Sequence, residues 1–395
     1  MPKDLINQLN AAEKNERLDA LQELAKMVRT GELQLPNFTD NINNHIHTTY
    51  SFSPYSPAKA VYMAWASGLA TAGIMDHDSV GGADEFIEAG RIMGLPVTVG
   101  FECRCSVVGT PFEGKKINNP DQSSVAYLAM HAIPHQMLGV AEAFLKPYRE
   151  KRNARNEKMV ERLNKKLAMY GIELDFERDV LPLSQYKNGG SVTERHLMYA
   201  LASTITDNEK HRYFLLADFK SQLLESVYVD ADDELPHISD FINLSKKLGA
   251  IPAYAYLGDV GDSVTGDKKR QAFEDSYLDE FMTYLASIGI KAVTYMPARN
   301  TLGQLKRVMA LCEANSLFQI SGEDINSPFQ SFICEKIAEP EFRHLIDSAW
   351  ALIGHEIAAG ERLEKGMFSV EAELAMPGLK DRIRHFADLA RQVCR

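Results

Sequence analysis

Short apolar segments that end in polar residues recur along the middle of the chain. There are seven: 42–47 (INNHIH), 70–78 (ATAGIMDHD), 95–103 (LPVTVGFEC), 125–131 (VAYLAMH), 250–256 (AIPAYAY), 290–296 (IKAVTYM) and 317–324 (LFQISGED). Segments of this length and composition are typical of buried strands. Helix-like segments lie between several of them, such as SPAKAVYMAWASG, which has Pro57 near its start and Gly68 at its end. This alternation predicts an α/β protein with a mainly parallel sheet.

The number of strands and the position of the polar residues favour a closed or nearly closed barrel. In an open doubly wound sheet the reactive side chains lie at one crevice, whereas here they lie at the ends of many strands. We therefore expect an α/β barrel whose reactive side chains share one rim.

Helical sequence is expected to flank and interrupt the barrel. Apolar positions at helical spacing predict a helical extension at 1–37 that packs on the outside of the main domain. Charged helical sequence at 137–236 predicts an insertion that caps the barrel mouth, and 335–395 is again helical and polar. The barrel domain is therefore expected to comprise 38–136 and 237–334.

Composition narrows the class of partner and the compartment. The chain of 395 residues has 54 acidic and 43 basic side chains, a net charge of −11, which opposes binding to a nucleic-acid polymer. It contains no apolar run of about 18 residues, and its charged N-terminus does not resemble a signal peptide. The five scattered cysteines argue against a disulfide framework. We expect a cytoplasmic protein with no membrane or nucleic-acid partner, and the sequence does not indicate an oligomeric state.

Histidines and carboxylates end the predicted strands. His45 and His47 are two residues apart, so both side chains leave the same face of a strand. Later strands end in polar residues that a parallel barrel brings onto the same rim, namely Asp76, His77, Asp78, Glu102, His131 and Asp324. Mixed imidazole and carboxylate ligands suit zinc, manganese or ferrous iron. The pattern predicts a divalent metal site.

The motifs that carry these residues resemble those of the polymerase and histidinol phosphatase (PHP) superfamily of metal-dependent phosphoesterases. They are HIHT at 45–48, MDHDS at 75–79, GFE at 100–102, the isolated His131, GAIPAYAYLG at 249–258 and SGEDIN at 321–326. The helical insertion resembles that of the nucleoside phosphate phosphatase branch. The resemblance implies a distorted seven-stranded barrel with up to three metal ions at its rim.

The resemblance also implies how the ligands are shared. The first ion takes His45, His47, Glu102 and Asp324; the second takes Glu102 and His131; the third takes His77. Three positions depart from the family pattern, because Phe52, Tyr256 and Asn326 stand where the family has ligands. Phenylalanine cannot ligate metal, and an amide oxygen replaces imidazole poorly. We therefore expect one or two bound ions and no third.

A mechanism of the same kind follows from the resemblance. Glu102 is expected to bridge two ions, which in two-metal sites lie ~3.5–4 Å apart, while bound water attacks phosphorus. Asp76 or Asp78 is expected to orient that water or a ligand histidine.

Substrate phosphate requires cationic or hydrogen-bonding partners. Arg195, which matches a family arginine near a histidine, and Arg299 are the expected cations, and Tyr256 is a candidate hydrogen-bonding group.

Three functions are compatible with the sequence. The first is hydrolysis of a small phosphorylated metabolite or nucleotide. The second is a degenerate barrel that binds metal or ligand without turnover, suggested by the three lost ligands. The third is an amidohydrolase-type reaction, since those barrels also begin with His-x-His, although they normally use a lysine that this sequence does not place.

Overall fold

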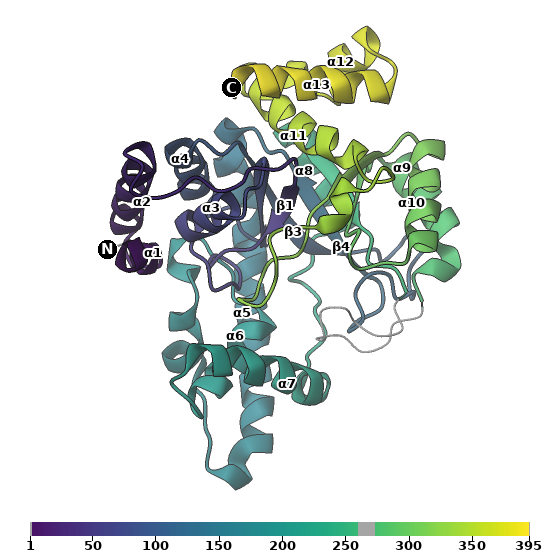
Figure 1. Ribbon diagram of the computed structural model, residues 1–395. Coiled ribbons are helices and arrows are strands. Elements are labelled where there is room, and N and C mark those ends of the chain that lie inside the picture. Colours follow the sequence, from purple (N-terminus) through teal and green to yellow (C-terminus); the bar gives the residue numbers. More distant parts are fainter. Residues whose placement is uncertain (1, 260–272, 395) are drawn as a thin grey trace.

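The computed structural model describes residues 2–259 and 273–394 and contains a seven-stranded sheet curled into a nearly closed barrel (Figure 1). The strands follow one another in the sheet in chain order: β1 (Ile42–Ile46), β2 (Thr71–His77), β3 (Val97–Ser106), β4 (Val125–His131), β5 (Ile251–Ala255), β6 (Ala292–Tyr295) and β7 (Phe318–Ser321). Each predicted apolar segment overlaps one strand, and β3 continues three residues past its segment. The expected α/β barrel is therefore confirmed.

One strand runs against the expected direction. The pairs β1–β2, β2–β3, β5–β6 and β6–β7 are parallel, but β4 is antiparallel to both β3 and β5. The barrel closes where β1 meets the segment after β7, because the amide of His47 donates to the carbonyl of Ile325 and the amide of Ile325 donates to the carbonyl of His45. The expectation that all strands end on one rim is therefore wrong for β4.

His131 still reaches the level of Glu102, because Glu102 lies in the middle of β3. The register pairs Phe101 with Met130 and Glu102 with Ala129. His131 is therefore a diagonal neighbour of Glu102 on the inner face, a spacing that long side chains can bridge.

Helices cover the outside of the barrel. They are α3 (Pro57–Ala66), α4 (Ala83–Met93), α8 (Ile238–Leu248), α9 (Leu278–Ile288) and α10 (Leu302–Ala314). Three of them end in a left-handed glycine, at Gly94, Gly249 and Gly289, a conformation that costs glycine little and stops the helix. The main core lies between these helices and the outer face of the strands, where Phe101 meets Phe241.

The two ends of the chain form separate helical layers. At the N-terminus, α1 (Pro2–Gln8) and α2 (Lys14–Arg29) lie beside α3 and α4 (Figure 1), and Arg17 forms a buried ion pair with Glu85. At the C-terminus, α11 (His344–Glu361) packs on β7, and α12 (Val370–Ala375) and α13 (Leu379–Val393) lie beyond it.

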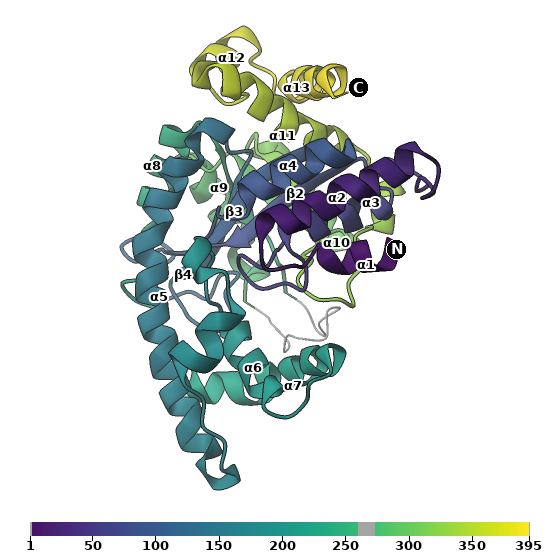
Figure 2. The same cartoon turned by 90° about the vertical axis from the view of Figure 1, so that its left-hand side faces the viewer.

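The insertion between β4 and α8 carries three longer helices, α5 (Leu138–Leu167), α6 (Glu194–Ser203) and α7 (Glu209–Val227). Figure 2 shows α5 running alongside the barrel and projecting past it, with α6 and α7 beside its far half. The short helical turns of the chain are His135–Met137, Ala168–Tyr170, Phe176–Val180, Leu181–Leu183, Tyr186–Asn188, Asp275–Tyr277, Glu335–Ala338 and Leu363–Lys365. The insertion has a hydrophobic cluster of its own.

Two observations bear on the surroundings of the chain. In the ranges 2–259 and 273–394, no helix combines the length and apolar character needed to cross a membrane. All five cysteines lie in these ranges, and each is a free thiol.

Candidate metal centre

His45 on β1 and His47, which directly follows this strand, converge with Asp324, which follows β7. One ligand atom from each of His45, His47 and Asp324 lies within 4.8 Å of the other two. The closest approach is 3.1 Å, between His47 Nε2 and Asp324 Oδ1. The strand alternation therefore delivers both histidines to one point, as expected from their spacing.

Glu102 lies at the centre of the histidines. Its Oε1 atom is 3.0 Å from His77 Nδ1, 3.4 Å from His47 Nε2 and 3.5 Å from His45 Nε2. His47, His77 and Glu102 form a second group of converging ligand atoms, and the rings of His47 and His77 stack at 4.7 Å. His47 and Glu102 thus connect residues from β1, β2 and β3.

The carboxylates of this cluster are ionised. Burial opposes ionisation of Glu102, but the nearby His77 and His45 outweigh it and lower the pKa of Glu102 to about 2. Burial likewise opposes ionisation of Asp324, but contact with His47 holds the pKa of Asp324 well below its usual range. Burial lowers the pKa of His77 to about 3, so this imidazole is neutral and can donate a lone pair.

One nitrogen of His47, Nε2, faces these carboxylates. The Ser51 hydroxyl donates its one proton to Asp76 Oδ1 (2.6 Å), so it accepts from His47 Nδ1 (3.2 Å). In the neutral ring Nε2 then carries the lone pair. Among the described residues this buried atom has no hydrogen-bond partner, and it faces Glu102 and Asp324. Lone pairs in this arrangement repel one another unless a cation lies between them. The donor set therefore fits a divalent metal ion.

His131 extends the cluster from β4. Its side chain is buried, and its Nε2 atom has no hydrogen-bond partner within residues 2–259 and 273–394. Burial, followed by the charge of His45, lowers the pKa of His131 to about 3. A neutral, buried and unpartnered imidazole beside His45 and Glu102 has the properties of a further metal ligand.

The two predicted aspartates have separate surroundings. Asp76 accepts hydrogen bonds from the Thr48 amide (2.7 Å), the Thr48 hydroxyl (2.5 Å) and Ser51. It therefore supports His47 through Ser51, which agrees with the expected role of orienting a ligand histidine. Asp78 instead forms an ion pair with Arg152 of α5. A direct role of either aspartate in orienting water stays a prediction.

The three departures from the family pattern have other partners. Phe52 packs its ring against His196, Tyr199 and Tyr213 of the insertion, at centroid distances of 5.0, 5.8 and 5.8 Å. The Tyr256 hydroxyl donates to Asp275 Oδ1 (2.7 Å), and the ring is buried. A ring engaged in packing explains how Phe52 is accommodated where the family has a ligand.

Asn326 connects the metal centre to a predicted phosphate-binding residue. Its amide group donates to Asp324 Oδ1 (2.6 Å), and its carbonyl accepts from Arg195 Nη1 (2.7 Å). Arg195, on α6 of the insertion, is thereby held next to the cluster. Arg299 is buried and donates from Nε to the Leu257 carbonyl (3.1 Å), so it braces the loop after β5. Substrate contact by Arg195, Arg299 or Tyr256 stays a prediction.

Sequence reasoning missed the residues that support the cluster. Ser51 lies four residues after His47, a position that gives no signal of its own. Arg149, Arg152 and Ser191 come from the insertion, 70 or more residues away from the strand they contact. Charge runs on a helix are usually solvent-exposed, so nothing marked these arginines as buried.

Solved structures of other proteins have a fold similar to that of this chain. No protein-family model matches the chain. A candidate metal-dependent phosphoesterase from Bifidobacterium adolescentis aligns over 80% of this chain and 98% of its own, with a TM-score of 0.56 and 19% identity. The chain has a PHP-type fold. The nucleoside phosphate phosphatase branch stays a prediction.

Two other proteins are similar to parts of this chain. An amidohydrolase from Chromobacterium violaceum aligns with this chain at a TM-score of 0.58 and 18% identity, over 78% of this chain and 96% of its own. A 5′-3′ exoribonuclease of Haemophilus influenzae is 31% identical over 80 residues, which is 20% of this chain and 27% of the exoribonuclease. The chain therefore matches only about a quarter of the length of that curated relative.

Proposed function

We propose that this protein is a metal-dependent phosphoesterase that hydrolyses a small phosphorylated metabolite or nucleotide. The observation that carries the proposal is the buried Nε2 of His47, which faces Glu102 and Asp324 and has no hydrogen-bond partner among the described residues. His45, His77 and His131 complete the proposed ligand set. Manganese, zinc and iron each suit these donors.

When bound, divalent ions lower the pKa of a coordinated water and polarise the oxygens of a phosphoryl group. The chain's own contribution is to position groups. Glu102 and Asp324 supply negative charge that is already ionised at neutral pH, and Asp76 fixes the orientation of His47 through Ser51. Arg195, held by Asn326, brings a guanidinium to the edge of the cluster, where it is proposed to bind substrate phosphate.

Metal analysis combined with hydrolysis tests the proposal. Protein purified without chelator should contain about two equivalents of metal and hydrolyse a generic aryl phosphate, and His47→Ala should abolish both. His211→Ala, which changes an exposed histidine on α7, is the matched control and should change neither.

The other outcomes separate the alternatives. Bound metal with no turnover of any phosphate ester indicates a degenerate barrel, and absence of metal contradicts the proposal outright. Turnover of an amide or lactone instead supports the amidohydrolase alternative, which the Chromobacterium structure keeps open.

The substrate panel should contain both monophosphates and short 5′-phosphorylated RNA. We expect the monophosphates to be preferred because the net charge of −11 disfavours a long polyanion. RNA belongs in the panel because the short match is to a 5′-3′ exoribonuclease. The proposed compartment remains the cytoplasm, in keeping with five free cysteines.

A further inference from the structure

The turn that follows β2 has an unfavourable backbone conformation. Asp78 has a φ of 51°, in the left-handed region that side-chain-bearing residues rarely adopt. The residue before it is His77, whose Nδ1 lies 3.0 Å from Glu102 Oε1. The position of a metal-centre histidine therefore depends on a turn that needs outside support.

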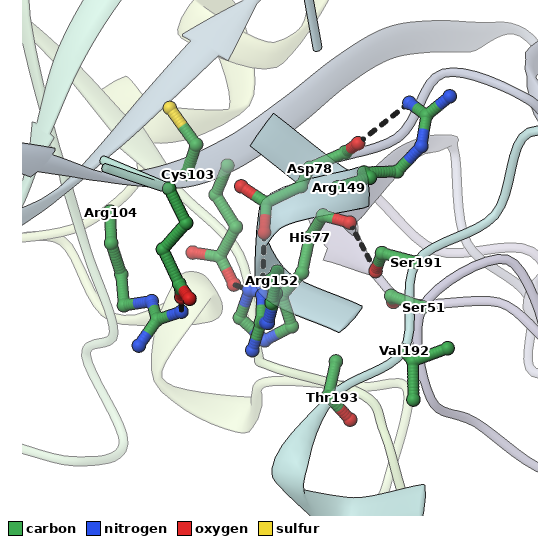
Figure 3. Close-up of polar contacts among 12 residues, drawn as sticks. Ser51, His77, Asp78, Cys103, Arg104, Arg149, Arg152, Ser191, Val192 and Thr193 are labelled. Atoms are coloured by element: carbon green, nitrogen blue, oxygen red, sulfur yellow. Dashed lines mark hydrogen bonds and ion pairs between the residues drawn. The ribbon is translucent and has the colours of Figure 1, made fainter. Parts of the chain in front are cut away.

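The helical insertion supplies that support from several sides (Figure 3). Ser191 donates its hydroxyl proton to the His77 carbonyl (2.7 Å). Arg149 donates to the Asp78 carbonyl (3.0 Å), and Arg152 binds the Asp78 carboxylate (2.5 Å). We call Arg149, Arg152 and Ser191 the insertion clamp.

The clamp residues are themselves fixed. Arg149 is paired with Glu142, and Arg152 is paired with Glu194 of α6, and both arginines are almost fully buried. Each guanidinium binds residue 78 and also a glutamate of the insertion. A planar guanidinium that is held by such a second partner leaves residue 78 few alternative positions. Through the clamp, the backbone position of His77 and Asp78 therefore depends on how α5 and α6 pack.

We propose that Arg149, Arg152 and Ser191 are positioning residues for the metal centre. They hold the turn at 77–78 so that the His77 imidazole faces Glu102. The inference rests on the proposed metal-dependent function, and it adds that the insertion helps to complete the metal centre.

The clamp acts on one of the two ligand groups. The resemblance assigned His77 to a third ion, but in the structure His77 groups with His47 and Glu102, whereas His45, His47 and Asp324 form a group without it. Loss of the clamp should therefore weaken the ion that uses His77 and spare the other. A general loss of stability would weaken both.

The matched pair Arg152→Met and Arg155→Met isolates this effect. Both arginines lie on α5, their side chains are 5% exposed, and both pair with Glu194. Arg152 also binds Asp78, while Arg155 binds Glu234 and the Val229 carbonyl. Metal-free protein of each variant is titrated with Mn²⁺, with free Mn²⁺ counted by electron paramagnetic resonance.

Arg152→Met should weaken one of the two Mn²⁺ affinities by roughly 10-fold or more and leave the other unchanged. Arg155→Met should leave both close to wild type. Equal losses in the two variants, or no change in Arg152→Met, would overturn the proposal. Ser191→Ala, which removes one hydrogen bond to His77, keeps the test valid if Arg152→Met does not fold.

A second measurement does not depend on metal. In metal-free protein labelled at histidine, Arg152→Met should shift the imidazole resonances of His77 and spare those of His131. If wild-type protein binds no Mn²⁺, the proposed function fails while this measurement still decides on the clamp. Unshifted His77 resonances in Arg152→Met contradict the clamp in either case.

Discussion

Ser51 fixes which nitrogen of His47 is available to a metal ion. Its hydroxyl has one proton to donate, and Asp76 Oδ1 accepts that hydrogen bond at a distance of 2.6 Å. His47 Nδ1 must then carry hydrogen toward Ser51, which leaves Nε2 to face Glu102 and Asp324. A serine thus sets the tautomer of a histidine that two ligand groups share.

Ser51→Ala should lower metal affinity, because the His47 ring loses the partner that orients it. Partners of this kind are typically worth about 10–100-fold in affinity. Calorimetric titration of metal-free protein with Mn²⁺ checks this. Ser331→Ala, at an exposed serine, serves as the control, and equal affinities in wild type and Ser51→Ala would refute the tautomer argument.

Glu274 is a buried carboxyl outside the metal centre. It accepts from the Tyr254 hydroxyl and from the Gly258 amide, and burial raises the pKa of Glu274 from 4.5 to about 8. The folded protein therefore keeps a proton that the unfolded chain releases. The stability that this proton confers is complete below about pH 4.5 and is lost as the pH rises through about 8.

Raising the pH from 6 to 9 should therefore destabilise the wild type relative to Glu274→Gln. The difference grows by at most about 1.4 kcal/mol per pH unit while only the folded form is protonated. Melting temperatures of both proteins across this range measure it. Glu280→Gln, which changes an exposed carboxylate on α9, should keep the wild-type pH profile; parallel profiles for wild type and Glu274→Gln would contradict the assignment.

At the scale of elements, the loop after β1 packs against the insertion and so connects it to the barrel by side-chain contacts. The Phe52 ring, in this loop, packs against Tyr199 and Tyr213 in the hydrophobic cluster of the insertion. The ring occupies a position where the resemblance expected a ligand, and it supplies apolar contact instead. The docking of the insertion thus depends on this side chain as well as on buried ion pairs.

Phe52→Ala should destabilise the packing of α6 and α7 on the barrel. Deleting a buried phenylalanine ring typically costs about 3–5 kcal/mol. Hydrogen exchange should therefore accelerate in α6 and α7 and stay slow in β1 to β3. Phe214→Ala, at a ring on α7 that is 57% exposed, should have a much smaller effect. Equal exchange rates in the two variants would show that Phe52 does not anchor the insertion.

At the scale of the whole molecule, the metal centre joins remote parts of the chain. The ligand candidates come from β1, β2, β3, β4 and the segment after β7. Without a cation, their carboxylates and lone pairs destabilise the fold that brings them together. Metal binding is therefore expected to be coupled to global stability.

Chelation should lower the melting temperature, and Mn²⁺ should restore it. At a free metal concentration 100 times the dissociation constant, one site adds about 2.7 kcal/mol. Scanning calorimetry of chelated and reloaded protein tests this. His47→Ala should melt at the same temperature with and without Mn²⁺, and a wild type that is equally insensitive would contradict the metal centre.

The antiparallel β4 shows where local pattern was insufficient. Its apolar segment predicted a strand correctly, but a strand's direction depends on which edges it pairs with and not on its own residues. The prediction that His131 lies near the other ligands assumed that β4 is parallel to its neighbours, which is wrong. His131 lies near Glu102 because β3 continues past Glu102 to Ser106.

The sequence by itself determined the seven strands and the nature of the metal-binding side chains. Alternation along a strand and the chemistry of imidazole and carboxylate are local properties, so His45, His47 and Glu102 could be named before the fold was known. Only the tertiary structure decided which groups support them. Ser51, Arg149, Arg152 and Ser191 act through contacts between distant segments, and such contacts exist only once the chain has folded.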